Sequence, residues 1–353
     1  MIFFTALSDV LLYIAFSYLA GSVVLKFVPA SRKPLLRESK TLALTSVAGI
    51  ALFSLAPVIE LASFLENGQG WWPAFLSVLI DYRTGHGWLV TALFCIVLGI
   101  MLYYNQSKYL LAYSLGILIL TVGYFSHVST LNLWGGFASH SIHFLAMAMW
   151  TGVLIHVSWF AESKTEWRNF LSWFTPFAIA CVAVLFASGI AIMLFFVEPS
   201  QYARSWVLPY GQLLLLKHLS IVPLLAAALI NGFLNKRQVY ERAWLRVETC
   251  LLLLVFVFTA FMSKQAPPHN INNTFRSEGA APFLEMIKGP LYIPIDGTWE
   301  MSFNGILLIL FGLLCLAMMI IGYKRQLSPW LSALFGSAFI MAVYIGLMLN
   351  MSY

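Results

Sequence analysis

The sequence predicts an all-α membrane protein, a bundle of about ten transmembrane helices. Of its 353 residues, 61% are hydrophobic and only 10% are charged. Soluble domains carry roughly 25% charged residues, so this composition excludes a water-soluble fold. Apolar runs of about 20 residues, the length needed to cross the hydrocarbon layer, recur along the whole chain.

The spans follow one another with short connections. We expect them at 4–27, 41–62, 86–104, 109–128, 138–160, 172–197, 211–234, 247–263, 303–322 and 329–349. The first run should stay as a span rather than be cleaved as a signal peptide, because no Lys or Arg precedes it and no small-residue cleavage pattern follows it. Short connections make successive spans antiparallel neighbours. The sequence therefore predicts one membrane domain over residues 1–353, ending in two spans at 303–350.

Two connections are longer than the rest. Residues 63–85 contain Trp71, Trp72 and Pro73, an aromatic and proline cluster typical of the membrane interface. Residues 264–302 contain His269 and many Asn, Gly and Pro residues. A connection of this length is expected either to cap the outer face or to be mobile.

The distribution of Lys and Arg predicts the orientation, because cytoplasmic loops are enriched in both. With the N-terminus outside, the cytoplasmic side holds Lys26, Arg32, Lys33, Arg37, Lys40, Lys108, Lys164, Arg168, Lys236, Arg237, Arg242, Arg246, Lys324 and Arg325. The outer side holds only Arg83, Arg204, Lys264, Arg276 and Lys288. Both termini are therefore predicted to lie outside, and the topology explains the net charge of +6 without a nucleic-acid partner.

The cysteines give no sign of a disulfide or of covalent haem. The sequence has no CxxC and no CxxCH, and each of the four cysteines stands alone in an apolar run. Cys95, Cys181, Cys250 and Cys315 are therefore expected to be small buried hydrophobic residues.

Most histidines lie at or just inside one edge of the spans. They are His86, His127, His140, His143 and His218. In the run SHSIHFLAMAMW, His140, His143 and Met147 stand at i, i+3 and i+7, which places them on one face of a helix. Imidazole and thioether together form a ligand set for copper. The spacing therefore predicts an outward-facing copper site, with Met147 about 6 Å deeper than His143.

Simpler interpretations stand beside the metal-binding one. His86 and His127 could anchor at the headgroup level or bond to a backbone carbonyl, and His156, near the cytoplasmic end, is expected to be a packing histidine. Met193 and Met262 are expected to fill the core, and they are less favoured ligands than the members of the stripe.

Lys217 is the most unusual charge because it lies inside a span. Its ammonium costs about 2.5–3.5 kcal/mol there on insertion scales, so it should pair with another group or face a polar cavity. Glu60, near the same end of its own span, is the candidate partner, and snorkelling of Lys217 to the outer interface is the alternative.

Three stretches together resemble the copper resistance D family of membrane proteins. They are HFLAMAMWTGVLIH at 143–156, YGQLLLLKHLSIVPLLAAALINGFLNKR at 210–237 and QAPP at 265–268. The resemblance is best over residues 80–268, and it is to the membrane part of copper-uptake members. It implies a polytopic helical bundle that handles copper, and it implies ligand roles for His143 and Lys217, less directly for His140, His127 and His86.

The favoured hypothesis is copper uptake across the cytoplasmic membrane, as Cu(I) or Cu(II), without enzymatic activity. The sequence has no P-loop, so a gradient or downhill metal flow would drive transport. Some family members carry a fused extracytoplasmic copper-binding domain, which this sequence lacks. The expected partners are therefore the lipid bilayer and a separate extracytoplasmic copper carrier, or the loop with His269 collects the metal.

Two other hypotheses remain open. A b-type cytochrome would bind haem between histidines of two helices at matched depth, and His143 with His218 is the available pair. A copper-resistance or assembly protein that does not transport the metal would need neither arrangement.

Overall fold

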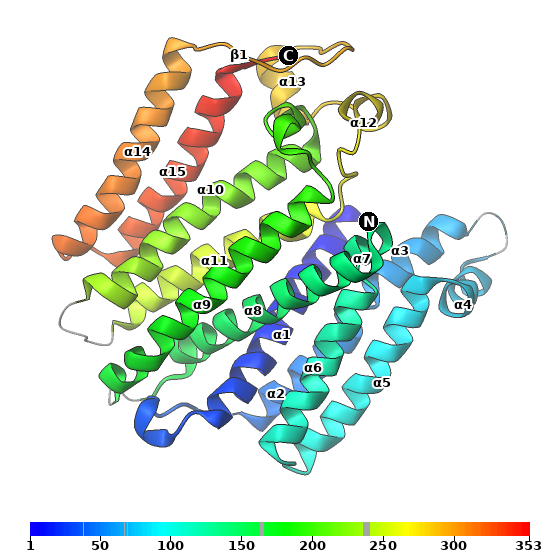
Figure 1. Cartoon of the computed structure of the whole chain (residues 1–353), viewed down its shortest axis with the longest axis vertical. Coiled ribbons are helices and arrows are strands. Elements are labelled where there is room, and N and C mark those ends of the chain that lie inside the picture. Colours follow the sequence, from blue (N-terminus) through cyan, green and yellow to red (C-terminus); the bar gives the residue numbers. More distant parts are fainter. Residues whose placement is uncertain (38, 67, 69, 163–165, 236–240) are drawn as a thin grey trace. The chain divides into compact units, whose positions relative to one another are not determined.

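The computed structural model describes residues 1–37, 39–66, 68, 70–162, 166–235 and 241–353, which are helical over most of their length. They form two compact units, one from Met1 to Phe195 and one from Phe196 onward, and each unit is described by itself (Figure 1). Lys164, Lys236 and Arg237, which contribute to the predicted orientation, lie outside the described residues. The all-α membrane fold is confirmed, whereas a single domain stays a prediction.

Nine helical segments in the described residues are long and apolar enough to cross a membrane. In the first unit they are α1 (Ile2–Phe27), α2 with α3 (Lys40–Phe53 and Ala56–Leu65), α5 (Arg83–Tyr103), α8 (Leu133–Phe160) and α9 (Trp167–Leu194). In the second they are α10 (Pro209–Leu229, continued by the π-helical turn Ile230–Leu234), α11 (Arg242–Met262), α14 (Phe303–Lys324) and α15 (Pro329–Leu349). The remaining predicted span is α6 (Lys108–Tyr124), a helix of 17 residues.

The connections contain short helices and strands that were not predicted from the sequence. They are η1 (Ala30–Arg32), α4 (Trp71–Asp81), α7 (His127–Leu131), η2 (Pro199–Gln201), η3 (Arg204–Val207), α12 (Ile271–Glu278), α13 (Pro282–Lys288), and the strands β1 (Thr298–Trp299) and β2 (Met351–Ser352). The two strands pair antiparallel, with Thr298 opposite Ser352.

Residues 264–302 cap one end of the second unit rather than hanging free. Ile271, Leu284 and Ile295 are buried in one cluster with Trp206 of η3 and Met348 of α15. The backbone of Ala281 also donates to the Val207 carbonyl at 2.8 Å. Of the two alternatives for this connection, the structure favours the cap, because the burial of apolar side chains fixes it against the ends of α10 and α15.

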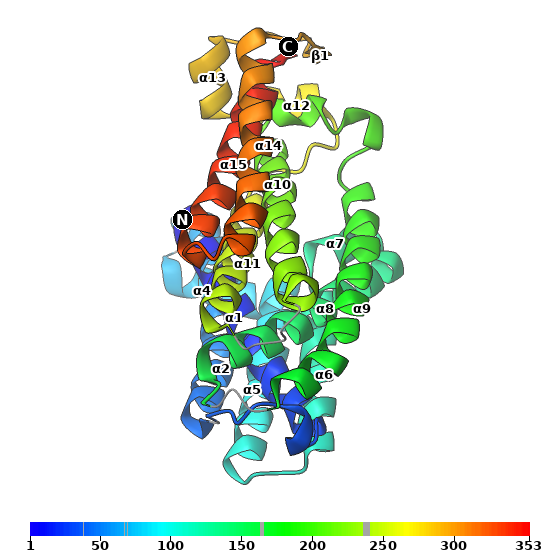
Figure 2. The ribbon, with the colours of Figure 1, turned by 90° about the vertical axis from the view of Figure 1, so that its left-hand side faces the viewer.

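Hydrogen bonds from unpaired backbone N–H groups to capping side chains explain where several helices begin. The side chains of Ser107, Asn132 and Ser302 accept hydrogen bonds from the backbone N–H three residues later, at 3.4, 2.9 and 3.0 Å. These N-caps satisfy donors that the first helical turn leaves open. At this same end of α14, Asn350 Oδ1, from the C-terminal cap of α15, accepts from the Ser302 backbone N–H at 2.7 Å. Figures 1 and 2 show α14 and α15 side by side.

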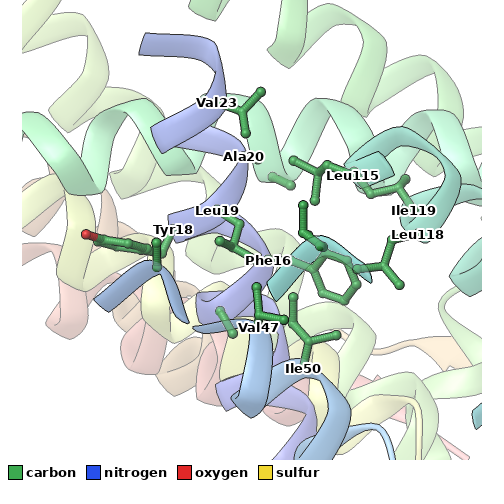
Figure 3. Packing of buried hydrophobic residues seen from close by; sticks show 14 of the residues in the cluster. Phe16, Tyr18, Leu19, Ala20, Val23, Val47, Ile50, Leu115, Leu118 and Ile119 are labelled. Atoms are coloured by element: carbon green, nitrogen blue, oxygen red, sulfur yellow. The ribbon is translucent and has the colours of Figure 1, made fainter. Parts of the chain in front are cut away.

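The core of the first unit is built around α1. Figure 3 shows Phe16, Val47, Ile50 and Leu118 gathered among α1, α2 and α6, while Tyr18 points to the other side of α1. On that other side α1 crosses α8, and the backbones approach closely where both helices carry glycine. A Cβ added to Gly152 would overlap with the Ser17 carbonyl oxygen and the backbone of Gly21.

Connections that are predicted to share one side of the membrane do meet within the first unit. Leu36 and Ala161 form an isolated antiparallel bridge, and the backbone N–H of Arg37 donates to the Phe160 carbonyl at 2.8 Å. Near the opposite helix ends, Arg83 donates to the Ser129 hydroxyl at 3.0 Å. These contacts agree with the predicted alternation of the spans.

Candidate metal site

The predicted stripe lies on α8, deeper in the helix than expected. Because α8 begins at Leu133 instead of residue 138, His140 is seven residues from its start, about 10 Å along the axis. His140, His143 and Met147 are all half-buried, and each faces a different neighbour.

His143 is held by a serine of α9. Its Nδ1 lies 3.0 Å from the hydroxyl of Ser188, which itself donates to the Val184 carbonyl at 2.6 Å. We assign the single hydroxyl hydrogen of Ser188 to the shorter contact with Val184, so that the Ser188 oxygen accepts a hydrogen bond from Nδ1–H of His143. This tautomer places the basic lone pair of the ring on Nε2, the nitrogen through which a metal can bind. Gly189 leaves room for the ring, since a Cβ there would lie 3.3 Å from His143 Cε1.

Met147 is oriented by hydroxyl groups at the crossing of α1 and α8. The Ser17 hydroxyl donates to the Met147 sulfur at 3.7 Å, and the Thr151 hydroxyl lies 2.7 Å from Ser17 Oγ and 2.7 Å from the Met147 carbonyl. A thioether is a weak hydrogen-bond acceptor, so these contacts orient the sulfur and a soft metal can displace them at little cost.

His140 stacks on Phe144, one turn deeper in α8, with ring centroids 6.2 Å apart and an interplanar angle of 10°. Phe144 in turn contacts Tyr13 of α1 edge-on at 6.1 Å. Asp9, 9% exposed, lies one turn before Tyr13. This buried carboxylate was not predicted, although a charged residue inside an apolar run is the same signal that singles out Lys217.

The other first-unit candidates have structural partners. His86 Nε2 lies 2.6 Å from the Ile80 carbonyl, and His127 is the exposed first residue of α7. His156 is buried, with Nδ1 2.8 Å from the Gly152 carbonyl and its ring stacked on Tyr18 at 4.5 Å. The His86 and His156 contacts favour their simpler interpretations.

Three further candidates are placed but stay predictions. Glu60 lies half-buried in α3, Met193 half-buried near the end of α9, and Met262 half-buried at the end of α11. In the described part of the chain, no three His, Cys, Asp or Glu side chains gather closely enough to hold a metal ion. A metal on α8 would therefore depend on the thioether in addition to the two imidazoles.

In the second unit, His218 of α10 is paired with a tyrosine. Its Nδ1 lies 2.7 Å from the Tyr202 hydroxyl. Burial raises the pKa of Tyr202 to about 12, so this hydroxyl stays protonated at neutral pH. Lys217 is half-buried beside His218 and has no acidic partner among the described residues of its unit. His269 is exposed, with its ring 6.0 Å from that of Phe196.

The candidates are divided between the two units. The stripe, His86, His127 and Glu60 belong to the first, and Lys217, His218 and His269 to the second. The Lys217–Glu60 pair and the haem site of His143 and His218 would each require residues from both units, so they stay predictions.

The four cysteines are all free thiols, as predicted. Cys95, Cys181 and Cys315 are buried. Cys250, on α11, is exposed, so the prediction of a buried hydrophobic residue is wrong there. A membrane helix presents its lipid-facing side as exposed surface, which explains why an apolar run does not imply burial.

Two buried polar pairs in the second unit were also not predicted from the sequence. Tyr344 donates to Gln212 Oε1 at 2.6 Å, and Asn231 Nδ2 donates to Glu248 Oε2 at 2.7 Å. Both pairs join residues of different helices, so neither is visible as a local spacing.

Comparison with known proteins finds one family. Residues 168–262 match the model of the family Copper resistance protein D (CopD). The match covers α9, α10 and α11 and confirms the family resemblance over a shorter range than residues 80–268. The α8 stripe precedes the matched residues. No curated protein and no solved structure matches the chain.

Proposed function

We propose that this chain, a multi-pass membrane protein similar to the copper resistance D family over residues 168–262, takes up copper across the cytoplasmic membrane. The metal would bind first on α8, at His140, His143 and Met147. The family's copper handling supports this proposal, in which copper is the substrate of the protein rather than a resident cofactor.

The observation that carries the proposal is the hydrogen bond between His143 Nδ1 and the Ser188 hydroxyl. Ser188 accepts from Nδ1–H, which leaves the ring's basic lone pair on Nε2. Metal-ligating histidines commonly donate their other N–H to such an outer partner, which fixes the tautomer and the ring orientation. For His143 this assignment defines Nε2 as the metal-donor atom.

The ligand set suits copper better than harder ions. Met147, one turn from His143 on the same helix face, supplies a thioether whose existing contacts are weak hydroxyl bonds. Thioether favours Cu(I), and imidazole accepts both Cu(I) and Cu(II), so the pair could hold either oxidation state with some adjustment. Mg²⁺ and Ca²⁺ prefer oxygen ligands, which the stripe lacks.

The predicted orientation gives the direction. Lys and Arg are concentrated in the loops at the far end of α8, so the stripe would lie toward the outer side and receive copper from there. An extracytoplasmic copper carrier would deliver the metal, or the exposed His269 in the 264–302 connection would collect it. His127 and His218 would be secondary ligands.

Uptake into proteoliposomes tests the function. We expect copper to accumulate with the wild-type protein, measured by mass spectrometry of the washed vesicles, and the initial rate to fall at least tenfold in His143→Ala. His86→Ala is the matched control, because His86 is exposed and bonded to the Ile80 carbonyl. Equal uptake by wild type, His143→Ala and protein-free vesicles would refute the proposal.

A further inference from the structure

A buried carboxylate lies in the second unit, away from the α8 stripe. Glu248 belongs to α11 (Arg242–Met262), six residues after its start, so it is about 9 Å along the helix. Its side chain is only 3% exposed. An ionisable residue inside a membrane span is costly and therefore suggests a function.

Asn231 is the hydrogen-bond partner of this carboxylate. Its Nδ2 lies 2.7 Å from Glu248 Oε2 and 3.3 Å from the Trp244 carbonyl, so both amide hydrogens are directed to α11. Asn231 belongs to the π-helical turn Ile230–Leu234 that continues α10. Such turns are rare and frequently occur at functional sites. The amide donates to Oε2, which leaves Oε1 to carry a proton.

No cation balances Glu248 among the described residues, whose ion pairs include only Arg204 with Asp296. The other titratable groups on its own helix and on the helices near it are Arg242, Arg246 and Cys250 of α11, Tyr210, Lys217 and His218 of α10, Cys315, Tyr323 and Lys324 of α14, and Tyr344 of α15. Lys217 and His218 precede Asn231 by at least 13 residues, about 20 Å along α10. Tyr344 is bonded to Gln212, and Tyr323 contacts Trp244.

A proton fits this site better than a metal ion. A buried charge without a partner costs several kcal/mol, and binding a proton removes that cost. A metal would need further ligands, and the described residues hold no group of three His, Cys, Asp or Glu side chains that could supply them. Copper(I) also prefers softer donors than a carboxylate and an amide.

We propose that Glu248 is an exchangeable proton-binding site within the membrane, with Asn231 as its fixed hydrogen-bond donor. The proton binds to Oε1 as an O–H bond forms, and it leaves as that bond breaks, toward the end of α11 at Arg242. Within the proposed copper uptake this exchange would couple the metal to a proton gradient. That coupling rests on the proposed function, whereas proton binding itself does not.

Infrared difference spectroscopy of the full-length protein in lipid, without copper, tests the site. Between about pH 5 and 9 the wild type should lose the carbonyl stretch of a protonated carboxylic acid as the pH rises. We expect this band to be absent in Glu248→Gln and retained in Glu241→Gln, the matched control just before α11. Asn231→Leu should shift its frequency, because the hydrogen bond to Oε2 is lost.

Three results would overturn the inference: a band that does not respond to pH, a band that persists in Glu248→Gln, or a band removed by copper at constant pH, which indicates a metal ligand. Glu248→Gln keeps an acceptor for the Asn231 amide, so it is expected to fold. If Glu248→Gln does not fold, the frequency shift of the band in Asn231→Leu provides a second test. Copper uptake driven by an acidic outer medium is measured separately. Failure of uptake in the wild type would reject the function while the infrared result still decides the proton site.

Discussion

The contact between His143 and Ser188 joins α8 to α9 at the proposed metal site. Ser188 is 8% exposed, and with its hydroxyl hydrogen assigned to the Val184 carbonyl its oxygen accepts from the ring. Replacing Ser188 with Ala removes this acceptor and lets the imidazole change tautomer or rotate. We expect copper affinity, measured by competition with a chelator, to fall about 10–100-fold, the usual cost of losing an outer-shell partner.

Ser172→Ala is the matched control for this variant. Ser172 is exposed on the same helix, and its hydroxyl donates to the Asn169 carbonyl at 2.7 Å. Its affinity for copper should equal that of the wild type. If Ser188→Ala also bound copper with wild-type affinity, the tautomer of His143 would not matter to binding.

Individual residues were predictable where the signal is local. His140, His143 and Met147 lie on one helix, so their spacing can be read from the sequence. Ser188 was not predictable, because serine is common in membrane helices and its role depends on which residue α9 brings against α8. Glu248 and Asp9 carried a usable signal, an acid in an apolar run, but their burial follows from packing that the sequence does not display.

At the scale of elements, the order of the spans was predictable and their boundaries were not. Every expected span has a helix in the structure. However, α8 begins at Leu133, because Asn132 caps it and the glycine-containing turn LWGGF before residue 138 is helical too. Hydropathy registers apolar composition, whereas a helix begins where its first N–H groups find acceptors. This difference moves His140 and His143 from the first turns of α8 to about two and three turns from its start, and Met147 to about four turns.

The crossing of α1 and α8 offers a test of the packing that orients Met147. Gly152 faces the backbone of α1 at Ser17 and Gly21, with no room for a Cβ. Gly152→Ala should therefore force the helices apart and cost at least about 1–3 kcal/mol of stability. We expect a lower Tm in detergent and weaker copper binding, since Ser17 would move away from the Met147 sulfur.

Gly116→Ala on α6 is the control for the crossing, because nothing lies within 4 Å of a Cβ at that position. It should leave Tm unchanged or raise it slightly, since alanine favours helix over glycine. Equal Tm values for Gly152→Ala and the wild type would mean that the two helices are not in close backbone contact.

For the whole molecule, the orientation decides whether the stripe faces outward. The charge asymmetry predicts that Arg37 is cytoplasmic and Arg276 external. Both side chains are exposed, so single cysteines can replace them in a background without the four native cysteines. In intact cells a membrane-impermeant thiol reagent should label Arg276→Cys, and it should label Arg37→Cys only after permeabilisation. The reverse pattern would place the stripe on the cytoplasmic side.

The composition was sufficient to predict the membrane fold, and the family resemblance was confirmed over residues 168–262. The path of the ion was not predictable, because it depends on residues of several helices that meet only in three dimensions. His156 is the histidine nearest the inner side. It was expected to be a packing residue, and the structure places it in the contact between α1 and α8 against Tyr18. Glu248 and Asn231 form a buried polar pair that only the folded structure reveals.

The copper content of the purified protein tests the central claim most directly. Wild type and the double variant His140→Ala/His143→Ala are compared by mass spectrometry, with His86→Ala as the control that keeps both stripe histidines. We expect copper bound to the wild type and to His86→Ala in similar amounts, and a loss of most of it in the double variant. Equal copper in all three proteins would contradict a copper site on α8.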